Sequence, residues 1–296
     1  MELIVEFGSN ACKVMQCKGN SVFIDYRIPL RLISNLDADG KMKEAAVSSM
    51  LSIISDIKSR FPEMQKIILV GTEAMRRATN SPEIVDLILE KTGLNMHILS
   101  VREEAEAAHK GIMTAIEPKG NILAFDIGGA STELIYGRDG RIKDVVSLPF
   151  GAVSLNDEFR GSDPYTNCAF HALEMFVDTN LKIRQAKDYT LIGTGGSLST
   201  MAAVMLGVKS FDAEALNGTV ISRAEVLRQV LMYRPKSVSE ICKIPGMDPA
   251  RADLMLPASF LVCQIIHKAG VDRVIVSTRG VRHGIICAIK QRQGKQ

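Results

Sequence analysis

The sequence predicts an α/β protein that contains two copies of one domain core. Segments with the pattern of strands alternate with segments of helical periodicity along most of the chain. A strand that ends in an acid, a glycine-rich bend, a strand, a turn and a further strand occur twice, and the two acids, Glu6 and Asp126, lie 120 positions apart. The length of 296 residues allows two domains, because a single core stops growing near about 250–300 residues.

The first half is expected to begin with three strands and to continue with alternating helices and strands. Apolar residues recur at helical spacing from Lys43 to Phe61, which predicts a helix with one buried face. Ser81 as N-cap with Pro82 in the first turn is typical of a helix start, and Gly93 is typical of a helix end. The expected elements are strands at 1–7, 11–17 and 21–26, a helix at 43–61, a strand at 66–71, a helix from 81 to 93, a strand at 95–100 and a helix at 102–116.

The second half opens with a break at residues 118–121, after which the strand pattern of the N-terminus returns. A chance match of two three-stranded segments is the alternative, but in both copies the turn follows the acid after 13 residues, which favours duplication. Ser222 and Glu225 form a capping-box pattern that opens a helix. The expected elements are two strands within 121–137, a strand at 141–150, a helix at 167–187, a strand at 189–193, a helix after the bend at 193–197, helices starting at 222 and 249, a strand at 272–277 and a last helix from about 280.

Composition narrows the class of protein. Apolar residues make up 46% of the chain and charged residues 23%, which is typical of a globular protein and not of a disordered or fibrous one. No apolar run approaches the ~18 residues that span a bilayer, and no basic leader precedes the first strand, so we expect a cytoplasmic protein with no membrane partner. The net charge of +3 does not indicate nucleic-acid binding, so no DNA partner is expected. The six scattered cysteines form no CxxC pair and are expected to be buried, reduced thiols.

Glycine-rich bends follow both acid-ended strands. Such a bend exposes backbone N–H groups without Cβ atoms in the way, and this concavity binds phosphate oxygens. A carboxylate beside a phosphate makes sense if it holds a divalent cation, so Asp126 is predicted to anchor a metal or its water. The alternative is a tight hairpin whose glycines serve only the turn. A third bend, "GTGGS" at 193–197, lies between a strand and a helix and favours the phosphate interpretation.

Seven segments, in order along essentially the whole chain, resemble the motifs of one family. They are "EFGSNACKV" (6–14), "VGTEAMRRATN" (70–80), "ILSVREEAEAAHKG" (98–111), "AFDIGGASTELIYG" (124–137), "SLPFGAVSLNDEF" (147–159), "IGTGGSLSTMAA" (192–203) and "VIVSTRGVRHG" (274–284). Each motif is weak alone, but seven in register resemble the exopolyphosphatase and guanosine pentaphosphate phosphatase family, Ppx/GppA.

The resemblance implies a fold. The family lies within the actin, sugar-kinase and Hsp70 superfamily, so we expect duplicated actin-like ATPase (ribonuclease H-like) domains, each a mixed sheet flanked by helices, with a cleft between them. Domain I is expected to comprise residues 1–119 joined by a C-terminal helix at 285–296, and domain II residues 120–284. Hinge closure is expected around residues 118–121 and near 284.

The resemblance also implies chemistry and partners. The family hydrolyses terminal phosphoanhydrides of polyphosphate, or converts pppGpp to ppGpp in the stringent response, with Mg²⁺, so Mg²⁺ or another divalent cation is the expected cofactor. The expected partners are polyphosphate or guanosine penta- or tetraphosphate and a second copy of the chain, as a homodimer. The water-orienting carboxylate is expected at Glu104, with Glu103 second, and the metal at Asp126 and Glu6.

A larger set of residues is expected to contact phosphate through glycine-rich backbone or through guanidinium groups. The set is Gly8, Ser9, Asn10, Arg76, Gly128, Gly129, Ala130, Ser131, Thr132, Gly195, Gly196, Ser197, Arg279 and Arg282. A solvated helix start is the alternative for the Glu103–Glu104 pair, and an ordinary surface residue is the alternative for each arginine.

Three positions depart from the family pattern. Glu6 replaces an aspartate, Ala11 a serine of the first loop, and Ala130 the last glycine of the second loop. These changes keep open a second function, a non-catalytic binder or sensor of polyphosphate or guanosine nucleotides. A phosphotransferase such as a sugar or acetate kinase is a third candidate, which the Glu103–Glu104 segment and the arginines of 274–284 disfavour.

Overall fold

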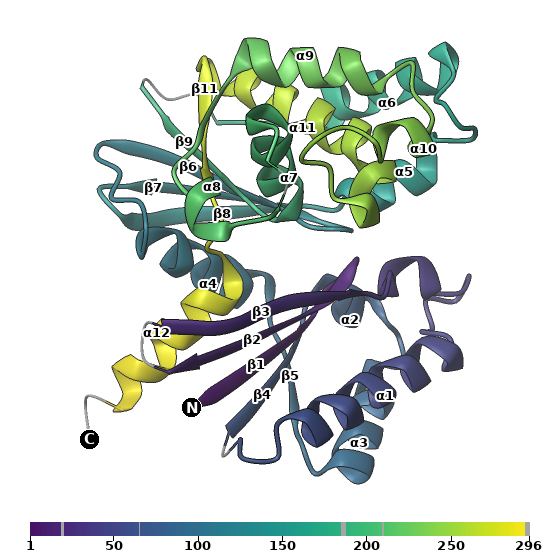
Figure 1. The fold of residues 1–296 in the computed structure, drawn as a ribbon, viewed down its shortest axis with the longest axis vertical. Coiled ribbons are helices and arrows are strands. Elements are labelled where there is room, and N and C mark those ends of the chain that lie inside the picture. The colour runs from purple at the N-terminus through teal and green to yellow at the C-terminus, as the bar shows by residue number, and fades with distance from the viewer. Residues whose placement is uncertain (19–20, 65, 185–187, 209, 294–296) are drawn as a thin grey trace. The chain divides into compact units, whose positions relative to one another are not determined.

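The computed structural model describes residues 1–18, 21–64, 66–184, 188–208 and 210–293 (Figure 1). Contacts between Cα atoms divide the chain into two units. Unit 1 comprises Met1–Glu104 with Ala288–Gln296, and unit 2 comprises Ala105–Cys287. Helices α4 (Val101–Met113) and α12 (Val281–Gln293) each run across this division. The domain limits expected from the sequence, at 119/120 and 284/285, stay a prediction.

Unit 1 is built on a mixed five-stranded sheet of order β3-β2-β1-β4-β5. β1 pairs antiparallel with β2 and β2 with β3, whereas β1, β4 and β5 run parallel. The strands are β1 (Glu2–Phe7), β2 (Ala11–Lys18), β3 (Ser21–Pro29), β4 (Lys66–Gly71) and β5 (Met96–Ile98). The turn expected between β2 and β3 falls on residues 19–20, outside the described residues.

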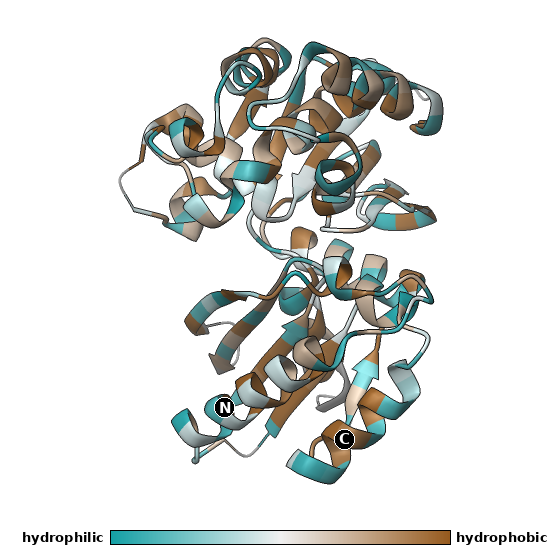
Figure 2. Cartoon of the chain, turned by 90° about the vertical axis from the view of Figure 1, so that its right-hand side faces the viewer, coloured by the Kyte–Doolittle hydropathy of each residue, from teal (hydrophilic) through white to brown (hydrophobic). Residues whose placement is uncertain are grey.

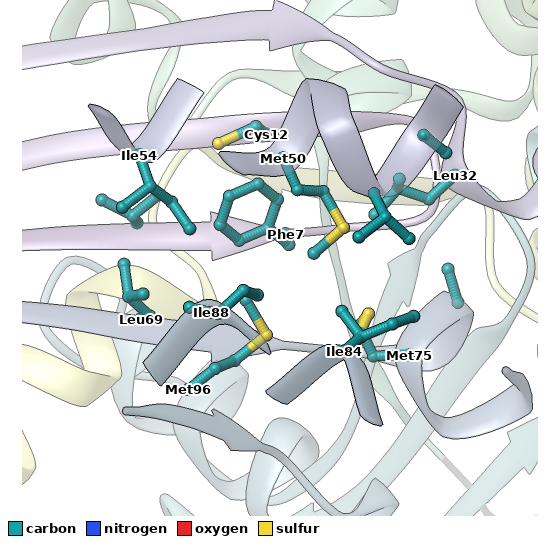
Figure 3. Close-up of a cluster of buried hydrophobic side chains, with 14 of the residues drawn as sticks. Phe7, Cys12, Leu32, Met50, Ile54, Leu69, Met75, Ile84, Ile88 and Met96 are labelled. Atoms are coloured by element: carbon teal, nitrogen blue, oxygen red, sulfur yellow. The ribbon is translucent and has the colours of Figure 1, made fainter. Parts of the chain in front are cut away.

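One face of this sheet carries the core of unit 1. Helices α1 (Glu44–Arg60) and α3 (Ser81–Thr92) present apolar faces to it, as helical spacing predicts. Figure 3 shows Phe7 of β1 between Met50 and Ile54 of α1 on one side and Ile88 of α3 on the other. Each fully buried side chain of this size stabilises the fold by about 1.5–3 kcal/mol relative to an exposed one. In Figure 2, the strands of unit 1 are coloured largely as hydrophobic, in agreement with this core.

The start of α3 differs from the expectation by one residue. Asn80, not Ser81, occupies the N-cap position, and Ser81 is the first helical residue. The Asn80 side chain does not cap the helix; its Oδ1 accepts a hydrogen bond from the Met42 N–H at 2.8 Å and its Nδ2 donates to the Met42 carbonyl at 3.1 Å. The helix end at Gly93, with φ of 72°, is confirmed.

Unit 2 repeats the sheet of unit 1 and adds one strand. Its order is β10-β11-β9-β6-β7-β8, with β6, β9 and β11 parallel and β6–β7–β8 antiparallel. Thus β8-β7-β6-β9-β11 repeats β3-β2-β1-β4-β5, and the predicted α/β fold with two mixed sheets is confirmed. The strands are β6 (Asn121–Ile127), β7 (Thr132–Arg138), β8 (Arg141–Leu148), β9 (Thr190–Thr194), β10 (Val220–Ser222) and β11 (Arg273–Ser277).

Helix α11 of unit 2 contacts α5, α6, α7 and α9, while α7 also lies against the sheet (Figure 1). Ser222 caps α9 as predicted, since its hydroxyl accepts from the Glu225 N–H at 3.2 Å. The helices are α5 (Ala152–Phe159), α6 (Asn167–Asn180), α7 (Gly196–Leu206), α8 (Ala213–Leu216), α9 (Arg223–Tyr233), α10 (Val238–Ile241) and α11 (Met255–Ala269). Short 3-10 helices lie at Leu32–Asn35 and Pro249–Leu254, and α2 (Glu73–Arg77) follows β4.

Two expected helices of the second half have different limits. The helix expected at 167–187 ends at Asn180, and residues 185–187 lie outside the described residues. The segment after Asp248 begins as a 3-10 helix and becomes α-helical only at Met255. In the described part of the chain, Pro249–Ala269 is the one helical stretch long and apolar enough to cross a membrane, which the sequence did not lead us to expect. Of its apolar 18-residue window, 72% is buried within the protein.

Candidate active site

Four polar residues occupy neighbouring register positions across the sheet of unit 2. Asp126 of β6 pairs with Glu133 of β7 on one side and with Thr194 of β9 on the other. Thr194 in turn pairs with Ser277 of β11. Residues that pair directly across strands point to the same face of a sheet. The row therefore gathers two carboxylates and two hydroxyls where β6, β9 and β11 end and the glycine-rich bends begin.

Asp126 and Glu133 form an acid pair within this row. Directly opposite residues have Cβ atoms roughly 4.5–5.5 Å apart, so their two negative charges repel unless a cation or proton lies between them. Glu133 is only 2% exposed, and its Oε1 accepts a hydrogen bond from the Ser147 hydroxyl at 3.0 Å. Among the described residues no group of three or more His, Cys, Asp or Glu side chains could hold a metal. Two carboxylates on paired strands are a donor set that suits Mg²⁺, which commonly takes one or two carboxylates and completes its shell with water and substrate phosphate.

The bend at 128–131 is held against the start of helix α5. The carbonyls of Gly128 and Gly129 accept hydrogen bonds from the first backbone N–H groups of α5, at 2.8 to 3.0 Å. Gly151, the N-cap of α5, must be glycine, because a Cβ there would lie 2.5 Å from the Gly128 carbonyl oxygen. The backbone N–H groups of Gly129 and Ser131 donate to no acceptor among the residues that the structure describes. Such amides suit a phosphate oxygen, and phosphate binding at this bend stays a prediction.

The third bend brings Gly195 against Asp126. Gly195 has φ of +100°, which favours glycine, and a Cβ at this position would lie 2.8 Å from Oδ1 of Asp126. At the next residues helix α7 begins, and the Ser197 hydroxyl is fully buried with no hydrogen-bond partner in the described part of the chain. The structure thus places Asp126, Gly195 and Ser197 at one end of the sheet, and their predicted metal and phosphate roles stay a prediction.

Arg251 is a residue of this region that sequence reasoning missed. A Cβ at Gly196 would lie 2.0 Å from a guanidinium nitrogen of Arg251, so the arginine packs on the glycine backbone at the N-terminus of α7. Arg251 is 7% exposed, and its Nε lies 3.5 Å from the Asp248 carboxylate. A buried guanidinium beside a helix N-terminus favours an anion. No local pattern marks Arg251, because its contact with Gly196 joins segments more than fifty residues apart.

The first copy of the bend has the same backbone but a different charge. The Gly8 N–H donates to the Ala11 carbonyl at 3.1 Å, just as the Gly128 N–H donates to the Ser131 carbonyl at 3.0 Å. The residue opposite Glu6 is Lys13, whose Nζ lies 2.6 Å from Oε1 of Glu6. Lys13 therefore neutralises the acid for which a metal role was predicted, and that role stays a prediction.

In unit 1, Glu104 is held by a largely buried arginine. Arg76 Nη1 donates to Oε2 of Glu104 at 2.6 Å and to the Leu99 carbonyl at 2.8 Å. Both side chains are nearly buried, at 15% and 11% exposed. Burial by itself would lower the pKa of Arg76, but ion pairs with Glu104 and Glu73 outweigh it and raise that pKa. The Arg76 guanidinium therefore stays charged.

Glu103, unlike Glu104, forms hydrogen bonds at the start of helix α4. Its Oε2 accepts from the Ser100 N–H at 2.8 Å and from the Ser100 hydroxyl at 2.7 Å, while the Ser100 hydroxyl accepts from the Glu103 N–H at 3.2 Å. This reciprocal arrangement caps the start of α4. The Ser100 backbone bond, followed by the Ser100 hydroxyl and His97, lowers the pKa of Glu103 to about 2. The Glu103 carboxylate is thus engaged at the helix start, whereas the Glu104 carboxylate pairs with Arg76.

The two C-terminal arginines differ in their surroundings. Arg279 Nη1 donates to the Thr114 carbonyl at 3.1 Å, and its Nη2 lies 3.2 Å from the Glu214 carboxylate. The Arg279 carbonyl accepts from the hydroxyls of Thr194 and Ser277 in the polar row. Arg282 lies half-buried in the first turn of α12. For both residues phosphate binding stays a prediction.

Comparison with known proteins identifies relatives along most of the chain. The model of the Ppx/GppA phosphatase family matches residues 20–293. A bifunctional 3-dehydroquinate synthase/phosphatase of Fusobacterium nucleatum is 25% identical over 92% of this chain, which spans 44% of that relative. A guanosine-5'-triphosphate,3'-diphosphate pyrophosphatase of Aeromonas hydrophila is 25% identical over 87% of this chain and 52% of its own length. Exopolyphosphatase 2 of Mycobacterium tuberculosis is 22% identical over 88% of this chain and 86% of its own.

Solved structures match the fold over nearly the whole chain. The crystal structure of the Ppx/GppA family member of Aquifex aeolicus superposes with a TM-score of 0.83 at 22% identity, covering 98% of both chains. This likeness supports the expected duplicated actin-like architecture of two mixed sheets flanked by helices.

Proposed function

The chain belongs to the Ppx/GppA phosphatase family, and on this premise we propose that it hydrolyses the terminal phosphoanhydride bond of inorganic polyphosphate or of guanosine pentaphosphate. The names of its relatives, an exopolyphosphatase and a guanosine-5'-triphosphate,3'-diphosphate pyrophosphatase, support both substrates. The shared chemistry of the two is a linear, strongly anionic phosphate chain with a free end.

The observation that carries this proposal is the setting of Glu104. A buried carboxylate that accepts a short hydrogen bond from Arg76 is fixed in direction beside a permanent cation. In the proposed reaction it orients a water molecule toward the terminal phosphorus and accepts its proton. The water oxygen forms a bond to that phosphorus, and the bridging P–O bond breaks, so that one phosphate and a chain shorter by one unit leave.

The residues of unit 2 are proposed to bind the phosphate chain. The amides of Gly129 and Ser131 and the start of α7, with Arg251 beside it, supply donors for phosphate oxygens. Asp126 and Glu133 would hold a Mg²⁺ ion, which would neutralise phosphate charge when bound.

Phosphate release by the purified protein with Mg²⁺ tests this proposal. Long-chain polyphosphate and guanosine pentaphosphate are supplied in parallel, and Glu104→Gln is assayed beside the wild type. Release from either substrate that Glu104→Gln abolishes supports the proposal and ranks the substrates. Equal turnover by Glu104→Gln, or no release from either substrate, contradicts it.

A non-catalytic binder is the second candidate, and one observation favours it. Lys13 neutralises Glu6 in the first bend, so this copy has a cation where the second copy has Glu133. A binder would retain polyphosphate on titration and release no phosphate. Titration of the same preparation with polyphosphate therefore separates this function from an unfolded or inactive enzyme.

A further inference from the structure

We propose that Glu73 is a positioning residue for Glu104, acting through Arg76. The proposal rests on the hydrolase function above and concerns a residue that sequence reasoning did not select. All three residues belong to unit 1: Glu73 and Arg76 lie in helix α2, and Glu104 lies in the first turn of α4.

The contacts form a continuous chain of charges. Oε2 of Glu73 accepts from both Nε and Nη2 of Arg76, at 2.9 and 2.7 Å. The opposite side of the guanidinium, Nη1, donates to Oε2 of Glu104 at 2.6 Å. The side chains of Glu73, Arg76 and Glu104 are 14%, 15% and 11% exposed. Water therefore competes weakly for these hydrogen bonds. Because the guanidinium is planar and rigid, its bonds to Glu73 fix the direction of the Nη1–H that it donates to Glu104.

This geometry changes what Arg76 can do. A guanidinium has five N–H groups, and the bonds to Glu73, Glu104 and Leu99 use four of them. One Nη2 hydrogen is left for a phosphate oxygen. Arg76 thus acts mainly as the holder of Glu104, and its own orientation depends on Glu73.

Removal of Glu73 should therefore disturb catalysis more than substrate binding. Without its Oε2, Nε and Nη2 of Arg76 lose their acceptor, and the guanidinium is free to turn about Nη1. A displacement of about 1 Å in a reacting group costs roughly 100-fold in rate. We expect kcat to fall roughly 10- to 100-fold in Glu73→Ala and less in Glu73→Gln, which keeps one oxygen acceptor and the side-chain shape. KM should stay within about twofold, because Arg76 has only one N–H left for phosphate and the other proposed phosphate-binding groups belong to unit 2.

Two variants of the same unit serve as controls. Arg77 Nε donates to the other oxygen of Glu73, Oε1, at 2.6 Å, so Arg77→Gln removes a Glu73 partner without touching Arg76. Glu90 is an exposed acid of α3 paired with Lys91, so Glu90→Gln makes the same chemical change as Glu73→Gln at a distant surface position. Both controls are expected to keep kcat within about twofold of the wild type.

The experiment combines steady-state kinetics with NMR of arginine side chains. The Arg76 Nε–H, assigned with Arg76→Lys, should exchange slowly with water in the wild type and in both controls, and fast in Glu73→Ala. A wild type that releases phosphate, with kcat lowered and KM kept in Glu73→Ala and Glu73→Gln, supports the proposal. Slow Nε–H exchange in Glu73→Ala, or unchanged kcat despite fast exchange, overturns it. A wild type that releases no phosphate instead overturns the proposed function, and the NMR result then still reports whether Glu73 holds Arg76.

Discussion

Asp126 of β6 and Glu133 of β7 stand directly opposite each other in the sheet of unit 2. At the same spacing in unit 1, Glu6 stands opposite Lys13 and forms an ion pair with it. The duplicated fold therefore holds two carboxylates in one copy and a neutralised acid in the other. The two copies of the bend share a backbone and differ in charge, and we propose that the second copy holds a cation, whereas in the first Lys13 already pairs with the acid.

This division predicts that the metal requirement depends on unit 2. Asp126→Asn and Glu133→Gln should each raise the Mg²⁺ concentration for half-maximal phosphate release by roughly 10- to 100-fold, because each would remove one of the two proposed charged ligands. A Mg²⁺ titration of the activity measures this. Asp144→Asn, which changes an acid of β8 that pairs with Arg184, should leave the titration unchanged. An unaltered Mg²⁺ requirement in both variants would mean that Asp126 and Glu133 do not bind the metal.

In unit 1 the pairing of Glu6 with Lys13 is expected to contribute to the free energy of unfolding. Glu6 is 3% exposed, so Lys13→Met leaves its carboxylate without the ammonium partner. We expect the free energy of unfolding to fall by about 1–3 kcal/mol, the cost of a buried polar group that loses its hydrogen bond. Urea unfolding followed by circular dichroism measures it. Lys13→Arg, which keeps the charge, should lose less, and equal stability of Lys13→Met and wild type would mean that Glu6 does not need this ion pair.

Much of this arrangement is readable from local sequence. The acid-ended strands, the bends and the 120-residue repeat predicted two similar sheets, since strand periodicity and glycine positions depend on neighbouring residues. The N-cap of α3 was misplaced by one residue because Asn80 bonds Met42, 38 positions away, instead of its own helix. Arg251 and Glu73 were not predicted for a related reason. Arg251 lies against Gly196, and Glu73 reaches Glu104 through Arg76, and only the folded chain brings these residues together.

Substitution of the two adjacent glutamates, Glu103 and Glu104, is expected to affect kcat very differently. Glu104→Gln should lower kcat by about 10²- to 10⁴-fold, the usual contribution of a general base. Glu103→Gln should keep kcat within a few-fold, because the Glu103 carboxylate is occupied by the Ser100 N–H and hydroxyl. Initial rates at saturating substrate measure both. The reverse order would exchange the roles of the two residues.

Glu103 should instead appear in the acid stability of the protein. Its pKa is lowered from 4.5 to about 2, so its stabilising effect is complete above 4.5 and is lost as the pH falls toward 2. Glu103→Gln should therefore be less stable than the wild type near neutral pH, and the difference should shrink across this window. Urea midpoints at about pH 6 and pH 3 measure it. The effect should be modest, because the side chain is half exposed, and a difference that does not depend on pH would contradict the cap.

Gly195 allows the contact between the third bend and the acid pair to be tested separately from backbone strain. Gly195→Ala places a Cβ at a φ of +100° and 2.8 Å from Oδ1 of Asp126. The matched control is Gly207→Ala at the other end of α7, where φ is +61° and nothing lies within 4 Å of the new Cβ. Both variants should lose about 1 kcal/mol of stability or somewhat more, because alanine is strained at positive φ.

Only Gly195→Ala should also move the Asp126 carboxylate. We therefore expect this variant alone to require more Mg²⁺ for phosphate release, by an amount similar to that in Asp126→Asn, while Gly207→Ala keeps the wild-type requirement. The comparison uses the Mg²⁺ titration together with urea unfolding of both variants. Equal Mg²⁺ requirements in the two variants would mean that the bend tolerates the extra methyl group without displacing Asp126, and that the glycine is needed there only for its backbone conformation.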